Sequence, residues 1–160
     1  MKVFISYSAT DTEFVRQIVE SIQEKGMEVY WWAERHELGE EVWKQIFGWI
    51  DQADVVLAIV TGNAVKRAMA VGNEVGYAKA KGKTIIPLVT NEERPFDLGC
   101  LNSLTYKMID VAAPQAGIQA IAAYLERKKQ EKADTQNREF WGNLTLLVGV
   151  VGLVWAAAKK

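Results

Sequence analysis

A segment in the middle of the chain, 54–60 (DVVLAIV), whose residues after Asp54 are all apolar, constrains the fold more than any other segment. Consecutive apolar positions indicate a strand buried on both faces, as in a parallel sheet that helices cover on both sides. Other β-prone segments lie at 3–7, 28–32, 83–89 and 104–109. Segments with helical apolar spacing separate the strands, at 12–26, 38–50, 64–80 and 114–132, and Asp11 or Thr12 is expected to cap the first of them. This alternation predicts an α/β fold, a flavodoxin-like doubly wound sheet of five parallel strands.

Charge and cysteine content exclude several classes of function. The 160 residues carry a formal net charge of −1, without the basic excess of a nucleic-acid-binding protein. One cysteine cannot form an intramolecular disulfide, and with a single histidine it cannot build a zinc site. We therefore expect no nucleic acid partner and no metal.

The C-terminal region differs from the rest in composition. Residues 140–158 (FWGNLTLLVGVVGLVWAAA) hold no ionisable side chain. As a helix they would span roughly 28 Å, close to the apolar thickness of a bilayer. We expect a folded domain over 1–130, a polar linker over 131–139 and a transmembrane helix over 140–158. The basic residues 127–129 before this segment favour a cytoplasmic domain; an assembly helix is the alternative interpretation.

Motifs that usually accompany this fold are missing. The sequence has no GxGxxG after the first strand and no GxxxxGK[ST], which argues against a redox dinucleotide fold and a Walker-type phosphate loop. A phospho-receiver would need carboxylates at the ends of strands one and three. Ser6-Tyr7-Ser8 and Val60-Thr61-Gly62 stand there instead.

An ordered series of short motifs covers residues 1–130. Its members are 4–8 (FISYS) with Asp11, 26–32 (GMEVYWW), 38–39 (LG), 43–46 (WKQI), 53–54 (AD), Asn63, 74–78 (EVGYA) and 82–88 (GKTIIPL). In this order they resemble a Toll/interleukin-1 receptor (TIR) domain of the bacterial type.

The resemblance implies an enzyme that cleaves NAD+ between nicotinamide and ribose, as an NAD+ hydrolase or ADP-ribosyl cyclase. The catalytic glutamate of the family corresponds to Glu74, and NAD+ is a substrate rather than a cofactor. The chemistry needs one carboxylate, because the pyridinium departs neutral without a general acid, whereas ordinary glycosidases use two. Val71 and Ala78 share a helix face with Glu74 and would bury it partly.

Further residues are assigned by the same resemblance. We expect Tyr7, Ser8, Trp32, Trp43 and Asn63 to bind the substrate. The sequence departs from the family at Ala70, where a tryptophan often helps to form the nucleotide pocket, and at Ala33, where many relatives carry aspartate.

The acidic loop 32–41 corresponds to the family's main oligomerisation loop. Its expected contact residues are Glu34, His36, Leu38, Gly39 and Glu40. The resemblance thus predicts self-association, with filaments as one outcome. Together with the apolar segment 140–158, it leads us to expect a membrane-anchored bacterial protein of anti-phage immunity. Two alternatives stay open: a non-catalytic scaffold that acts through homotypic contacts, and a virulence factor that mimics host TIR signalling.

Overall fold

The computed structural model describes residues 1–32, 41–66, 68–91, 101 and 103–157, with side chains through residue 140 apart from 65–70. Its five strands are β1 (Lys2–Ser6), β2 (Glu28–Tyr30), β3 (Val55–Val60), β4 (Thr84–Thr90) and β5 (Lys107–Ile109). Its helices are the 3₁₀ turn η1 (Ala9–Asp11), α1 (Thr12–Glu24), α2 (Val42–Gln52), α3 (Gly62–Lys66), α4 (Ala68–Ala80) and α5 (Pro114–Ala157).

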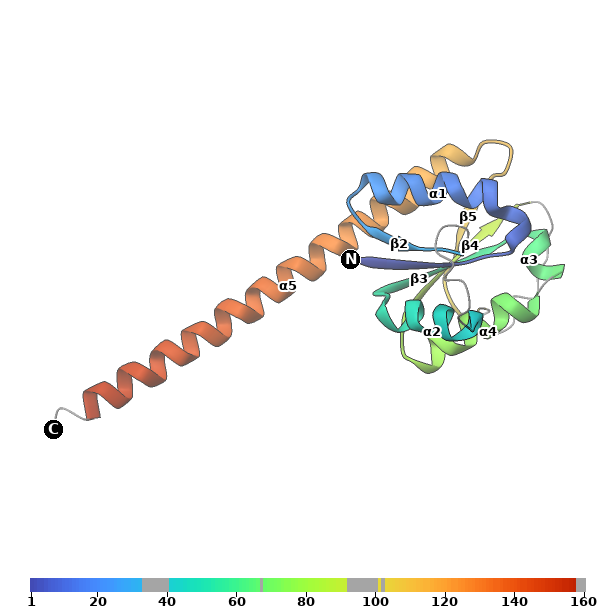
Figure 1. Ribbon diagram of the computed structural model, residues 1–160. Coiled ribbons are helices and arrows are strands. Elements are labelled where there is room, and N and C mark those ends of the chain that lie inside the picture. The colour runs from blue at the N-terminus through green and yellow to red at the C-terminus, as the bar shows by residue number, and fades with distance from the viewer. Residues whose placement is uncertain (33–40, 67, 92–100, 102, 158–160) are drawn as a thin grey trace. The chain divides into compact units, whose positions relative to one another are not determined.

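The strands form one parallel sheet in the order β2-β1-β3-β4-β5. Helix α1 covers one face, and α2 and α4 cover the other (Figure 1). This confirms the predicted doubly wound sheet. The strand order reverses between β1 and β3, and in such sheets ligands bind outside the carboxyl ends of the strands at that point.

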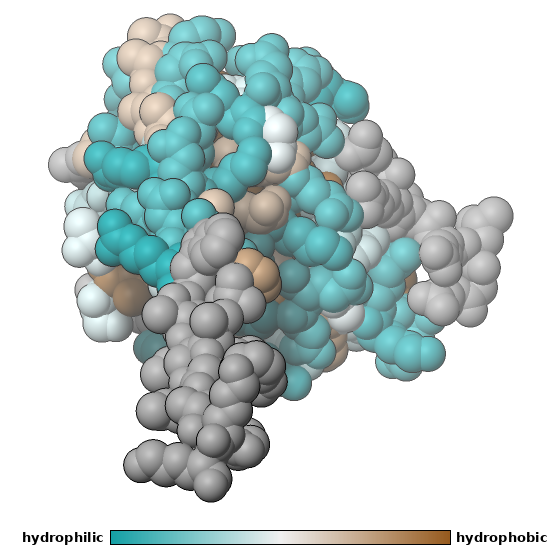
Figure 2. Space-filling view, turned by 90° about the vertical axis from the view of Figure 1, so that its left-hand side faces the viewer, coloured by the Kyte–Doolittle hydropathy of each residue, from teal (hydrophilic) through white to brown (hydrophobic). Residues whose placement is uncertain are grey.

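The sheet is the centre of the hydrophobic core. Every residue of β3 is buried, as its unbroken apolar sequence predicts. On the face that α2 and α4 cover, one cluster joins both layers: Phe4, Tyr30, Ile46, Trp49, Ile50, Ala53, Val56 and Ala78. Each large apolar side chain buried in this way contributes about 1.5–3 kcal/mol. Outside the core, the face in Figure 2 is mostly hydrophilic, with small separate apolar patches.

Several predicted boundaries change in the structure. The helix expected over 64–80 begins earlier, at Gly62, and is described as α3 and α4, on either side of residue 67, which lies outside the described residues. The hydroxyl of Thr61 accepts a hydrogen bond from the backbone N–H of Ala64 and so caps α3. Helix α2 begins at Val42, directly after Glu41, whose backbone is extended; the expected start at residue 38 falls within 33–40, which lie outside the described residues.

The C-terminal helix is longer than predicted. Helix α5 continues through 131–139, the expected linker, to Ala157. The chain divides into two compact units, 1–124 and 125–160. Within the part of the chain that the structure describes, no helix is long and apolar enough to cross a membrane. The predicted transmembrane helix over 140–158 is therefore not confirmed; the side chains from residue 141 onward lie outside the description.

Candidate active site

Glu74 lies on α4 and faces the sheet, with 9% of its surface exposed. The hydroxyl of Ser6, the last residue of β1, donates a hydrogen bond of 2.5 Å to its Oε2 atom. Burial raises the pKa of the Glu74 carboxyl from 4.5 to about 7, although the hydrogen bond from Ser6 lowers it. At neutral pH the group is therefore present in both its ionised and its protonated form.

Glu74 borders a cleft with a volume of about 200 Å³. The cleft is lined by Phe4, Ile5, Tyr7, Ser8, Ala9, Trp32, Val42, Trp43, Ile46, Val71 and Glu74. Whole-ligand pockets usually measure about 300–1,000 Å³, so this cleft can enclose only part of a dinucleotide. Its lining is mainly apolar, and a carboxylate interacts more strongly with a nearby positive charge where water is scarce.

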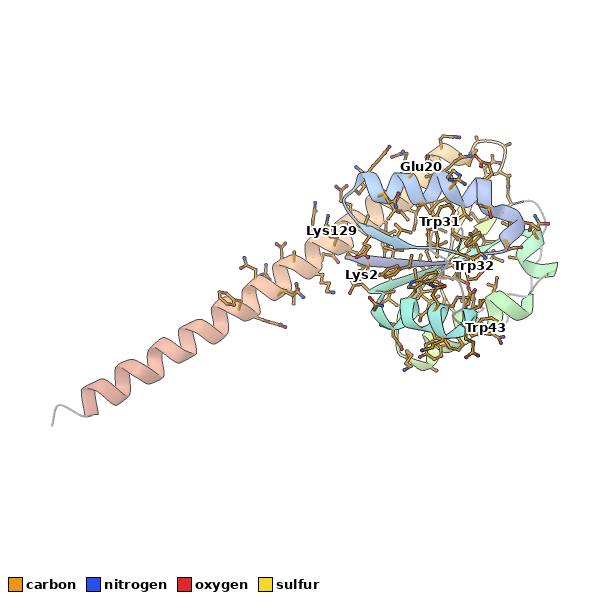
Figure 3. The ribbon with its side chains drawn as sticks, viewed as in Figure 1. Lys2, Glu20, Trp31, Trp32, Trp43 and Lys129 are labelled. Atoms are coloured by element: carbon orange, nitrogen blue, oxygen red, sulfur yellow. The ribbon has the colours of Figure 1, made fainter. Side chains whose placement is uncertain are left out.

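The structure brings together five of the residues that the sequence assigned to the site. Glu74 comes from α4, Tyr7 and Ser8 follow β1, and Trp43 is on α2. Trp32 lies just beyond β2, and Figure 3 shows it between the sheet and α2. Their roles toward a substrate stay predictions, but they line one cavity at the carboxyl edge of the sheet.

Asn63 is outside the cleft lining and has a different partner. Its side-chain amide donates to Oδ1 of Asp11 at 2.7 Å, and Thr61 donates to Oδ2 at 2.5 Å. Asp11 stands at the N-cap of α1 without a side-chain capping bond. Asp11, one of the two residues expected to cap this helix, therefore links the segment after β1 to the segment after β3.

Ser6 is the site residue that the sequence did not assign. It belongs to the first motif, and the available signal was the run of three hydroxyl-bearing residues, Ser6-Tyr7-Ser8, after the apolar part of the first strand. Its strand position makes it fully buried. The expected loop residues Glu34, His36, Leu38, Gly39 and Glu40 lie outside the described residues, as do Ala33 and the side chain of Ala70.

In the described part of the chain, no three histidine, cysteine, aspartate or glutamate side chains converge. Among the described residues, the cleft and its border offer the Glu74 carboxyl, the Ser6 and Ser8 hydroxyls and aromatic side chains.

Fold and cleft together define an α/β domain of flavodoxin-like topology, with a buried carboxyl group at the point where the strand order reverses. The family model of the TIR domain matches residues 3–130. The chain therefore belongs to the TIR domain family, as the motif series predicted. A search of curated proteins finds no match.

Solved structures with the same fold are distant in sequence. A Clostridium botulinum protein described as the CMP N-glycosidase BcmB is 21% identical, with a TM-score of 0.55, over 76% of this chain and 98% of that one. The TIR domain of the Toll-related receptor TRR-2 from Hydra magnipapillata is 18% identical, with a TM-score of 0.56, over 69% and 83%. The TIR domains of the activated Roq1 resistosome are 15% identical, with a TM-score of 0.51, over 57% and 58%. These similarities concern the fold.

Proposed function

We propose that this TIR domain cleaves the N-glycosidic bond between nicotinamide and ribose in NAD+, with Glu74 as the catalytic carboxylate. The observation that carries the proposal is the buried Glu74 carboxyl at the border of an apolar cleft. Its position at the strand-order reversal between β1 and β3 is where this sheet topology places ligands. A poorly solvated carboxylate is suited to stabilise positive charge that develops on a ribose.

The proposed step needs no proton donor. The electron pair of the C1′–N bond leaves with the nicotinamide, whose cationic ring becomes neutral. The ribose is left as an oxocarbenium ion, which ionised Glu74 stabilises electrostatically. In hydrolysis, water attacks C1′ and releases one proton; in cyclisation, a nucleophilic atom of the same ADP-ribose takes the place of water.

A second candidate reaction follows from the protonated form of Glu74. A neutral pyrimidine base leaves a ribose readily only when a general acid protonates it, and a carboxyl whose pKa is about 7 can supply that proton at neutral pH. The similarity in fold to a protein described as a CMP N-glycosidase makes CMP the natural compound to test.

One experiment separates the two reactions. The purified full-length chain is incubated with NAD+ and with CMP between pH 5.5 and 9, and released nicotinamide and cytosine are measured. NAD+ cleavage should rise with pH as Glu74 ionises, and the Glu74→Gln variant should be inactive. Cytosine release that falls with rising pH would favour the second reaction. No cleavage of either compound by the assembled protein would favour the non-catalytic scaffold.

We also place self-association and a role in bacterial anti-phage immunity within this proposal. The support is the acidic loop 32–41, which corresponds to the family's oligomerisation loop, and the similarity in fold to TIR domains described in the activated Roq1 resistosome. Charge reversal at Glu40 and Glu41 should reduce both clustering and NAD+ cleavage. Full specific activity of a strictly monomeric sample would contradict it. A virulence role would instead require binding to host TIR domains.

Membrane anchoring with a cytoplasmic TIR domain stays a proposal as well. Its support is the absence of ionisable side chains from residues 140–158 and the helical backbone through Ala157. The full-length chain should sediment with membranes and dissolve in detergent, and Val150→Arg should release it because a charge at mid-span is costly. Equal distribution of both proteins in the soluble fraction would leave an assembly helix as the interpretation.

A further inference from the structure

Ser6 and Glu74 meet because a strand and a helix place side chains at similar intervals. Alternate residues of a strand point to the same face about 6.6 Å apart, and residues four apart on a helix lie about 6 Å apart. Phe4 and Ala78 belong to one core cluster. Moving from Phe4 to Ser6 on β1, and from Ala78 back to Glu74 on α4, gives the next pair of facing residues, which is the hydrogen-bonded one.

Ser6 is held firmly in this position. Its backbone is paired with Ala58 of the central strand β3, and its side chain is fully buried. A serine hydroxyl can donate to an ionised carboxylate and accept from a protonated carboxyl. It can therefore stay bonded to Glu74 in both protonation states.

The hydrogen bond uses one of the two carboxyl oxygens. Among the described residues, Ser6 is the one hydrogen-bond donor to Glu74, and it contacts Oε2. Glu74 also borders the cleft, and no described residue donates a hydrogen bond to its Oε1 atom. Of the described cleft residues, Tyr7 is the other titratable group; Asp11, at the same edge of the sheet, is bonded to Thr61 and Asn63.

We propose that Ser6 is a positioning residue, which holds the Glu74 carboxyl in one orientation toward the cleft and favours its ionised form. A hydrogen bond to a carboxylate stabilises the charge, whereas burial opposes it. The proposal rests on the proposed NAD+ cleavage, for which the ionised form is the active one. Ser6 would thereby set the pH range in which the enzyme works.

The test compares Ser6→Ala with two matched variants of the full-length chain. Ser6→Thr keeps the hydroxyl, and Ser21→Ala removes another buried serine, on α1. Two quantities are measured from pH 5 to 10: the titration of Glu74, by carbon NMR of glutamate labelled at the carboxyl and assigned with Glu74→Gln, and the rate of nicotinamide release.

In Ser6→Ala we expect Glu74 to titrate at higher pH than in the unmodified chain. The rate at pH 7 should fall about fivefold and recover above pH 9, with KM little changed, since one hydrogen bond to a charge changes an equilibrium by about tenfold. Ser6→Thr should restore the profile, and Ser21→Ala should leave it unchanged.

An unchanged Glu74 titration in Ser6→Ala would overturn the proposal, and so would a shifted titration without any change in the pH profile. If Ser6→Ala does not fold, Ser6→Cys, a weaker donor of similar size, takes its place with the same expected direction. If the unmodified chain releases no nicotinamide at any pH, the proposed function fails. An upward shift of the NMR titration would then still establish that Ser6 favours the ionised form of Glu74.

Discussion

Polar groups in very different surroundings lie next to the two ends of strand β1. At the carboxyl end, Glu74 is buried with one described hydrogen-bond donor, Ser6, and its pKa is raised to about 7. At the amino end, Lys2 is partly exposed and has several partners. Both ends lie on the same sheet and link the same layers, so the difference lies in solvation and in the number of partners.

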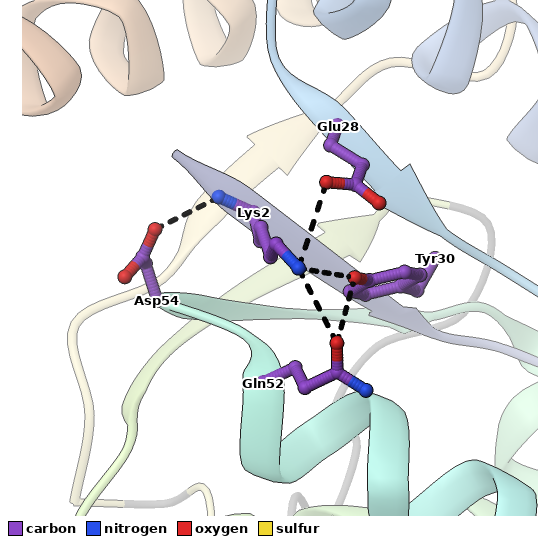
Figure 4. A network of polar contacts seen from close by, with 5 residues as sticks. All are labelled: Lys2, Glu28, Tyr30, Gln52 and Asp54. Carbon is purple, nitrogen blue, oxygen red and sulfur yellow. Dashed lines mark hydrogen bonds and ion pairs between the residues drawn. The ribbon is translucent and has the colours of Figure 1, made fainter.

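The amino end is a network of compensated groups (Figure 4). The Lys2 ammonium donates to the Tyr30 hydroxyl at 2.8 Å and to Gln52 Oε1 at 3.3 Å, and lies 3.7 Å from the Glu28 carboxylate. The Lys2 backbone N–H donates to Asp54 at 2.8 Å. The hydrogen bond to Tyr30 raises the pKa of Lys2 and stabilises its charged form.

The comparison shows which polar cluster to examine for chemistry. The Lys2 network has more hydrogen bonds and ion pairs than the Ser6–Glu74 pair, so the number of polar contacts alone would point to Lys2. That network stabilises the charge its lysine already carries in water, whereas burial of Glu74 disfavours the form that ordinary glutamates adopt. A buried charge with little compensation reduces stability, and groups of this kind are common at functional sites.

The largest expected effect is on activity. Glu74→Gln removes the charge but keeps an oxygen that can accept from Ser6, so nicotinamide release should fall by about 10²–10³-fold or more while the fold is kept. Glu28→Gln, a glutamate at the opposite end of the sheet, is the matched control and should cleave NAD+ at the unmodified rate. Initial rates at saturating NAD+ provide the measurement. Equal activity of the two variants would contradict the proposal that catalysis depends on the carboxyl end of the sheet.

The next effect is on stability, in the opposite direction. Because the pKa of Glu74 is higher in the folded than in the unfolded chain, the folded state binds more protons between pH 4.5 and 7, and stability falls as pH rises through that window. The loss amounts to about 3 kcal/mol. Glu74→Gln removes it, so the variant should be the more stable protein at pH 7.5. Denaturant unfolding at pH 4.5 and 7.5 checks this; a constant difference between the two proteins would contradict it.

Smaller effects on stability are expected at Asp11 and Asp54, whose side chains form hydrogen bonds between the β1 and β3 regions. Asp11 accepts bonds from Thr61 beyond β3 at the carboxyl end, and Asp54 accepts from Lys2 at the amino end. Asp11→Ala and Asp54→Ala should each lower the free energy of unfolding by about 1 kcal/mol, since both bonds are partly solvated. Asp11→Ala alone should also reduce NAD+ cleavage, because it loosens the edge that carries the cleft. A matching loss of activity in Asp54→Ala would show that the effect is general destabilisation.

The sequence predicted the parts of this picture that follow from periodicity. The alternation of apolar segments predicted five parallel strands in a doubly wound sheet. The motif series predicted the family and pointed to Glu74 as the candidate catalytic residue. It could not predict the partner of Glu74, because the pairing with Ser6 depends on how α4 lies across β1. Asp11 or Thr12 was predicted as a helix cap because local preference favours capping. In the structure, the two carboxylate oxygens of Asp11 instead accept hydrogen bonds from Thr61 and Asn63, which are distant in sequence. The predicted membrane helix rested on composition alone, and the structure does not confirm it.

The smallest expected effect is at Lys2. Lys2→Met keeps most of the apolar stem and removes the ammonium from Tyr30, Gln52 and Glu28. The side chains of Lys2 and Glu28 are 40% and 42% exposed, so water replaces the lost partners at little cost. The melting temperature should decrease by no more than about 3 °C, with NAD+ cleavage and its pH profile unchanged. Salt provides the second measurement: the small difference between Lys2→Met and the unmodified chain should shrink at 1 M NaCl, because exposed charges are screened there. A large loss of stability that persists in salt would show that the amino end, too, depends on a charge whose partners water cannot replace.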